Sequence, residues 1–200
     1  MKLTAKSDLP PVVTLATRDR LIAAMMQALS TRGFHGVGLN EILAVAAAPK
    51  GVLYHHFPGG KSELAQVAIS ASTEQMVARV TKSFGKKGDL ASLLAKWFEA
   101  SALLLSEDQF ERGCPLATVA LETTAADVAL RRALANSFAQ VTGAIALALE
   151  SHGHPPQGAK ALASLIVSAY EGALIQARVA HDPAPIRQAA LALAPLLTTR

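Results

Sequence analysis

Apolar residues recur at three- and four-residue steps along most of this 200-residue chain, and this spacing decides its fold class. Leu21, Met25 and Leu29 repeat in this way near the N-terminus, and Leu130 and Leu134 do so further along. Such spacing places apolar side chains on one face of an α-helix, whereas a half-buried strand needs strict alternation. The sequence contains no clear alternating run and no internal repeat. The chain is therefore predicted to be all-α.

Glycine and proline divide the chain into a series of predicted helices. Thr17 is predicted to cap the first helix, and Gly33 to end it. Pro49 is placed in the first turn of the third helix, where its missing N–H is not needed. The predicted helices span residues 17–32, 39–46, 49–57, 61–84, 90–106, 115–123, 126–151, 157–180 and 183–197.

Composition restricts the class of protein and its compartment. Hydrophobic residues make up 51% of the chain and charged residues 17%, which excludes disorder over most of its length. No run of about 18 consecutive apolar residues occurs, so we expect no membrane-spanning helix, and we expect no signal peptide. The one cysteine, Cys114, excludes an intrachain disulfide and fits a reducing compartment. We therefore expect a soluble cytoplasmic protein that does not associate with a membrane.

Charge is distributed unevenly along the chain. Residues 1–88 contain 11 Lys and Arg against 5 Asp and Glu, a net charge of +6, whereas residues 89–200 contain 8 against 10, a net charge of −2. A basic N-terminal part joined to a mildly acidic remainder suggests that only the first part meets a polyanion such as nucleic acid. The alternative is a chance excess of charge on a solvated face.

The predicted helices at 39–46 and 49–57 have the spacing of a helix-turn-helix, since a tight turn of three alanines joins them. The second helix begins with Lys50, Gly51 and Val52, and small residues there allow a helix to approach the floor of the major groove. Leu53 and Phe57 should anchor this helix to the core. Tyr54 and His55 should face outward, although Tyr54 could instead cover an edge of the core.

Residues 17–22, 32–34, 39–42 and 50–57 (TRDRLI, RGF, LNEI and KGVLYHHF) together closely resemble the TetR family of bacterial transcriptional repressors. Further strings at 39–43, 48–51, 57–61, 113–116 and 120–122 (LNEIL, APKG, FPGGK, GCPL and ALE) look like its subgroup typified by LmrA and YxaF. Two positions depart from the family pattern. Ala47 stands where many members have glycine, at a cost of about 1 kcal/mol in a left-handed turn, and Pro49 stands where many have a capping Ser or Thr.

Pro10 and Pro11 disfavour a helix, so residues 1–16 are predicted to form a flexible arm. The resemblance implies a helix-turn-helix DNA-binding domain over 17–62 and a ligand-binding and dimerisation domain over 63–200. Lys50 should meet a phosphate or a guanine edge, Val52 a thymine methyl, and Lys61 a phosphate. The arm could add backbone contacts or have no role. The residues expected at the DNA are Thr17, Asn40, Lys50, Gly51, Val52, Tyr54, His55 and Lys61.

Several large side chains stand out in the C-terminal part, because aromatic residues make up only 4% of the chain. They are either core residues or the lining of a ligand pocket between helices. Glu171 is expected to be solvated; in an apolar pocket it could instead select a cation. Cys114 is expected to be a small buried residue, with a redox sensor as the alternative. The candidate ligand-binding residues are Met76, Trp97, Phe98, Phe110, Cys114, Tyr170 and Glu171.

Together these features predict a repressor that binds a near-palindromic operator as a homodimer and is released by a small apolar or amphipathic molecule. An activator, a ligand-independent DNA-binding protein and, more remotely, a helical metal- or thiol-dependent enzyme remain alternatives. The sequence lacks paired carboxylates and an H-x-x-E-H type cluster, so we expect no catalytic residue, metal or cofactor. The residues expected at the dimer interface are Ala163, Ala169, Ala173, Ile186, Leu191 and Leu193; the alternative is that both stripes pack only within one chain.

Overall fold

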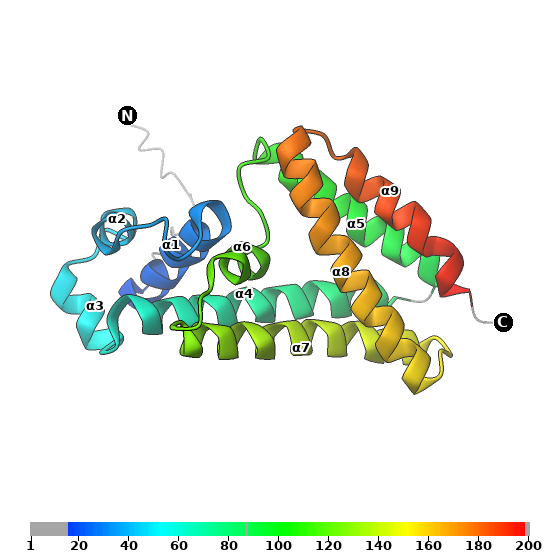
Figure 1. Ribbon diagram of the computed structural model, residues 1–200, viewed down its shortest axis with the longest axis horizontal. Coiled ribbons are helices and arrows are strands. Elements are labelled where there is room, and N and C mark those ends of the chain that lie inside the picture. Colours follow the sequence, from blue (N-terminus) through cyan, green and yellow to red (C-terminus); the bar gives the residue numbers. More distant parts are fainter. Residues whose placement is uncertain (1–15, 87, 199–200) are drawn as a thin grey trace, which may run out of the picture.

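The computed structural model describes residues 16–86 and 88–198, and these residues are almost entirely helical (Figure 1). They contain no strand, which confirms the all-α prediction. The predicted arm lies outside the described residues, apart from Ala16. The helices are α1 (Thr17–Arg32), α2 (Leu39–Val45), α3 (Lys50–His56), α4 (Gly60–Phe84), α5 (Leu90–Glu107), α6 (Pro115–Glu122), α7 (Val128–Ser151), α8 (Pro156–Ala180) and α9 (Ala184–Leu193), followed by the 3₁₀ turn η1 (Ala194–Leu197).

Two predicted helix starts differ from the observed ones. Ala16 occupies the N-cap of α1 and Thr17 is already helical, so the prediction that Thr17 caps this helix was wrong. Pro49 lies at the N-cap of α3 with extended backbone (φ −65°, ψ 148°), one residue before the helix. Its carbonyl accepts hydrogen bonds from the N–H groups of Val52 and Leu53, which is what an N-cap carbonyl does. Gly33 ends α1 with φ +73°, as predicted.

The first three helices pack against one another at the N-terminal end of the hydrophobic core. Leu21 and Met25 of α1 are fully buried, and so is Leu53 of α3. Phe57, directly after α3, is buried as well, so the two predicted anchors of the second helix-turn-helix element both lie in this core. With Leu53 inside, the other residues of this seven-residue helix remain half-buried or exposed.

Helix α4 connects the N-terminal and C-terminal parts of the molecule. Its 25 residues span about 38 Å at the usual rise per residue. It packs against α1 and along α7, and Figure 1 shows α4 and α7 side by side along the long axis. The predicted border between residues 62 and 63 falls within the first turn of α4. The two predicted domains therefore share one continuous helix.

Helices α5, α8 and α9 pack together at the opposite end of the molecule from α2 and α3 (Figure 1). By length and composition α8 could cross a membrane, although buried helices of water-soluble proteins pass the same test. Among the residues expected at a dimer interface, Ala163, Ala173, Ile186 and Leu193 are buried within the chain itself, and Ala169 packs against the same core. For the four buried residues that expectation was wrong, because α8 packs on α7 and α9, and α9 packs on α5 as well as on α8.

Candidate nucleic-acid interface and cavity

The turn between α2 and α3 adopts a left-handed conformation without a glycine. Ala47 has φ +47°, a conformation that costs an alanine about 1 kcal/mol. The guanidinium of Arg20, from α1, donates hydrogen bonds to the Ala46 carbonyl at 2.9 Å and to the Ala47 carbonyl at 3.3 Å. Hydrogen bonds from a charged donor favour this turn enough to offset the strain. Sequence reasoning did not identify Arg20, because nothing in its local pattern connects it to a turn 26 residues away.

The outer face of α3 is open to solvent. Lys50, Gly51, Tyr54 and His55 are exposed, and Val52 is half-buried. A Cβ added at Gly51 would meet nothing within 4 Å, so nothing on the protein obstructs an approach to this point.

Tyr54 is 45% exposed, and its ring also lies against the start of α4. Gly60 has φ +65°, and a Cβ at that position would lie 3.2 Å from Cε1 of Tyr54. The ring of Tyr54 thus packs on the start of α4 while a large part of it remains accessible.

The other residues expected at the DNA lie on three different helices. Asn40 is exposed in the first turn of α2, and Thr17 is half-buried at the start of α1. The ammonium of Lys61, in the first turn of α4, donates to the Phe34 carbonyl at 2.6 Å and lies 4.4 Å from the centre of the Phe34 ring. Burial lowers the pKa of Lys61, and the charges of Glu122 and Glu41 oppose this shift. Lys61 therefore joins α4 to the turn after α1.

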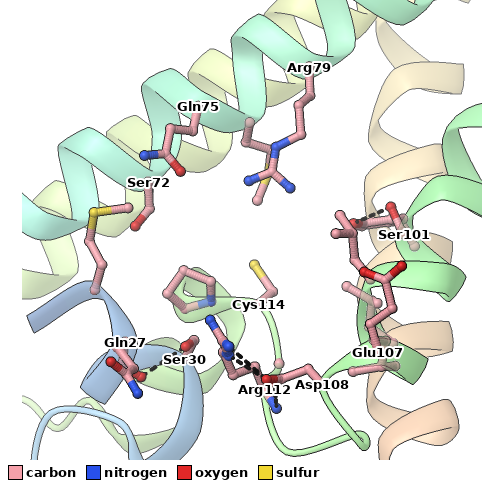
Figure 2. A pocket seen from close by; sticks show the side chains of 18 of the residues that line it. Gln27, Ser30, Ser72, Gln75, Arg79, Ser101, Glu107, Asp108, Arg112 and Cys114 are labelled. Atoms are coloured by element: carbon pink, nitrogen blue, oxygen red, sulfur yellow. Dashed lines mark hydrogen bonds and ion pairs between the residues drawn. The ribbon is translucent and has the colours of Figure 1, made fainter. Parts of the chain in front are cut away.

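A cavity of about 650 Å³ lies where α1, α4, α5, α8 and the residues before α6 meet (Figure 2). Three of the expected ligand-binding residues line it, namely Met76, Cys114 and Tyr170. Trp97 and Phe98 are buried behind Tyr170: the Trp97 ring stacks on the tyrosine ring at 4.7 Å, and the Phe98 ring meets its edge at 5.4 Å. Phe110 is outside the lining and packs beside the ring of His181.

The walls of the cavity are more polar than the sequence suggested. Figure 2 shows Arg79 of α4 and Cys114 pointing into the space from opposite sides. Arg112 is paired with Asp108 at 2.7 Å, and the hydroxyl of Tyr170 donates to Ser101 at 3.0 Å. The other polar residues in the lining are Gln27, Ser30, Ser72, Gln75 and Glu107. Sequence reasoning missed this polar set because its members come from several helices, and no local pattern shows that they meet around one cavity.

Glu171 is enclosed next to the cavity, and the expectation that it is solvated was wrong. Among the described residues, its Oε2 atom has no hydrogen-bond partner. Burial raises the pKa of Glu171 to about 7, and a hydrogen bond with the Cys114 thiol offsets only part of this. Burial, together with the charge of Glu171, also raises the pKa of Cys114 well above its usual value. The thiol is therefore protonated at neutral pH, which disfavours the redox-sensor alternative.

The end of α1 is held by residues beside the cavity. The N–H of Gly113 donates to the Ser30 carbonyl at 2.8 Å, and the guanidinium of Arg178 donates to the Thr31 carbonyl at 3.0 Å. Ser30 and Gly113 also line the cavity. Helices α1 and α4, which line the cavity, therefore also contact the helix-turn-helix. Among the residues 16–86 and 88–198, no group of three or more His, Cys, Asp or Glu side chains could hold a metal ion.

Comparison with known proteins gives one consistent result. Residues 21–68 match the profile of bacterial regulatory proteins of the tetR family, and residues 91–192 match that of the transcriptional regulator LmrA/YxaF-like C-terminal domain. An HTH-type transcriptional regulator of Mycobacterium tuberculosis is 32% identical over 176 residues, which cover 84% of this chain and 88% of that protein. The HTH-type transcriptional regulator LmrA of Bacillus subtilis is 25% identical, with coverage of 85% and 90%.

Solved structures share the fold over nearly the whole chain. The regulatory protein TetR from Rhodobacter sphaeroides has a TM-score of 0.80 at 24% identity, and the similarity covers 90% of this chain and 97% of that one. A cysteine mutant of the regulator CifR, complexed with 26-bp double-strand operator DNA, has a TM-score of 0.76 at 18% identity, with coverage of 94% and 98%.

Proposed function

The chain belongs to the TetR family of bacterial transcriptional regulators, in the LmrA/YxaF-like subgroup, and from this we propose that it is a repressor that binds a near-palindromic operator as a homodimer and is released by a small amphipathic molecule. The observation that carries the proposal is structural. The exposed helix-turn-helix packs against α1 and the start of α4, and both of these helices also line the cavity. As a regulator of transcription, the protein would work in the cytoplasm, where its operator lies.

Helix α3 is the element that we expect to enter the major groove. Its exposed face combines a cation at Lys50, an unobstructed backbone at Gly51 and the ring of His55, which are suited to phosphates and base edges. Lys61 can also contact a phosphate while it binds the Phe34 carbonyl. An ammonium has three N–H donors, and that carbonyl uses only one of them. Tyr54, Asn40 and Thr17 would contact the backbone around this helix.

The dimer interface is proposed on the face of α8 that the chain leaves uncovered. Leu165, Ile175 and Val179 are 47%, 44% and 80% exposed, and they lie at steps of ten and four residues on one stripe of the helix. Gly172 falls on the same stripe, and a Cβ added there would meet nothing within 4 Å. A glycine inside a helix costs about 1 kcal/mol relative to alanine, and no contact within the described residues requires glycine at this position. Close approach of a second copy of α8 supplies that reason, and Leu191 of α9, also exposed, would extend the contact.

The cavity is the proposed effector site. Apolar walls such as Met76 and Leu105, together with the guanidinium of Arg79, fit a molecule with an apolar body and a hydrogen-bond acceptor. A ligand that contacts Arg79 would act on α4, whose first turn lies beside α3. To shift the protein from a 99:1 to a 1:99 ratio of the DNA-binding to the released state, the ligand must bind the released state more tightly by about 5.5 kcal/mol.

The test starts with selection of bound duplexes from a random pool by the purified protein, followed by titration of the selected duplex. We expect a near-palindrome and a binding constant that falls steeply with salt. Lys50→Ala should reduce the slope of log K against log salt by about one unit. Lys160→Ala, which removes an exposed lysine of α8 far along the chain from α3, should leave the slope unchanged. If no duplex is enriched at low salt, the proposal fails.

Effector binding is tested by screening amphipathic compounds for release of the labelled duplex. Trp97 is the one tryptophan and stacks on Tyr170, which lines the cavity, so ligands that fill the cavity should change its emission. Compounds that release DNA without changing Trp97 emission would show that the effector site lies elsewhere.

A further inference from the structure

Glu122, the last residue of α6, binds the backbone of the turn that leads from α1 into α2. The Phe34 N–H donates to its Oε1 at 2.9 Å, and the His35 N–H donates to its Oε2 at 2.7 Å. Both carboxylate oxygens are thus engaged by consecutive N–H groups, although Glu122 is 87 residues or more away in sequence. The turn and α6 therefore act as one unit while this contact lasts.

Gly33 is shaped for this contact in two ways. Its φ of +73° lies in the left-handed region, which directs the following N–H groups toward the carboxylate. A Cβ added at Gly33 would also overlap Oε1 of Glu122. The glycine thus permits both the conformation of the turn and the close approach of the carboxylate.

The same turn is tied to the start of α4. Lys61 donates to the Phe34 carbonyl at 2.6 Å, and the charge of Glu122 helps to keep its ammonium protonated. A second contact comes from the loop after α6, where His35 Nε2 lies 3.5 Å from Asp127 Oδ2. The turn that Glu122 binds is therefore also held by the first turn of α4 and by the loop after α6.

We propose that Glu122 is a positioning residue for DNA binding, which fixes the orientation of the helix-turn-helix relative to the C-terminal part of the chain. This inference rests on the proposed function. The contacts of Gly113 and Arg178 hold the end of α1 itself, whereas Glu122 holds the segment that leads from α1 into α2. Without the carboxylate, α2 and α3 keep their contacts with α1 but lose this link to α6.

In the proposed dimer, Glu122 then determines which spacing between operator half-sites the protein prefers. In a two-fold dimer, the orientation of each helix-turn-helix decides where the two α3 helices meet the DNA. Adding one base pair between half-sites moves one of them by about 3.4 Å and rotates it by about 34°. A rigidly held helix-turn-helix cannot follow this change, whereas a loosely held one can.

The experiment compares the selected operator with versions that have one base pair added or removed between the half-sites. We expect wild type to lose about tenfold or more in affinity for the altered spacings, because one half-site no longer meets its helix. Glu122→Ala should lose no more than about threefold between spacings. Glu111→Ala, which removes an exposed glutamate from the loop before α6, should behave as wild type.

Glu122→Asp provides a milder variant should the alanine variant fail to fold. It keeps the charge, but it is one methylene too short to reach both N–H groups, so it should show the same tolerance of spacing. A residue that only stabilised the fold would lower the unfolding temperature and leave the spacing preference intact. If folded Glu122→Ala or Glu122→Asp discriminates between spacings as strongly as wild type, this inference is overturned and the proposed function stands. If wild type enriches no duplex at all, both are overturned.

Discussion

Replacing Glu171 with glutamine is expected to stabilise the protein at alkaline pH. The folded pKa of Glu171 is about 7, against an ordinary value of 4.5, because its carboxylate is buried. Each pKa unit corresponds to about 1.4 kcal/mol, so keeping Glu171 ionised and buried costs about 3 kcal/mol. The enclosed Oε2, which lacks a partner among the described residues, is the structural source of this cost.

The direction of the pH dependence follows from proton binding. Because the pKa is raised on folding, the folded state holds this proton more tightly than the unfolded state does. The corresponding stability is fully present below about pH 4.5 and is lost as the pH rises through about 7. Glutamine has nearly the same size and does not titrate. The stability of Glu171→Gln relative to wild type should therefore rise between these pH values by up to about 3 kcal/mol and then remain constant.

Urea unfolding followed by far-ultraviolet circular dichroism, at several pH values, measures this difference. All samples need the same protomer concentration, since association shifts the apparent stability. Glu111→Gln, at an exposed position, controls for the loss of one surface charge. Parallel pH profiles for wild type and Glu171→Gln, within about 0.5 kcal/mol throughout, would refute the argument, because they would mean that Glu171 is as solvated in the folded protein as in the unfolded chain.

Three further outcomes are expected. Arg20→Ala removes the donors to the Ala46 and Ala47 carbonyls and should lower the free energy of unfolding by about 2 kcal/mol. Urea unfolding measures this change, and an unchanged free energy would contradict the role of Arg20 in the turn. Val179→Asp places a charge on the exposed stripe of α8 and should shift light scattering from a dimer toward the 20.8 kDa monomer; a monomeric wild type would exclude the proposed interface. Native Cys114 should react with a thiol reagent much more slowly than in urea, because it is buried and protonated, and equal rates would argue against that description.

The sequence by itself determined the helices and the helix-turn-helix. The period of apolar residues and the positions of glycine and proline are local signals, and they report local backbone conformation directly. Leu53 and Phe57 were identified as anchors because their four-residue spacing puts them on one face of a short helix, and both are buried. The family resemblance was readable for the same reason, since its motifs are contiguous strings.

Only the tertiary structure decided which residues meet across the molecule. The carboxylate of Glu171 is enclosed, Trp97 lies behind the cavity wall, and Glu122 reaches the turn at Phe34. Each of these facts depends on the packing of helices that are distant in sequence. A helical pattern shows that a residue lies on the apolar or the polar side of its own helix, but the neighbour that covers that side comes from another helix. Burial, pKa and partners therefore emerge only once α1, α4, α6 and α8 are packed together.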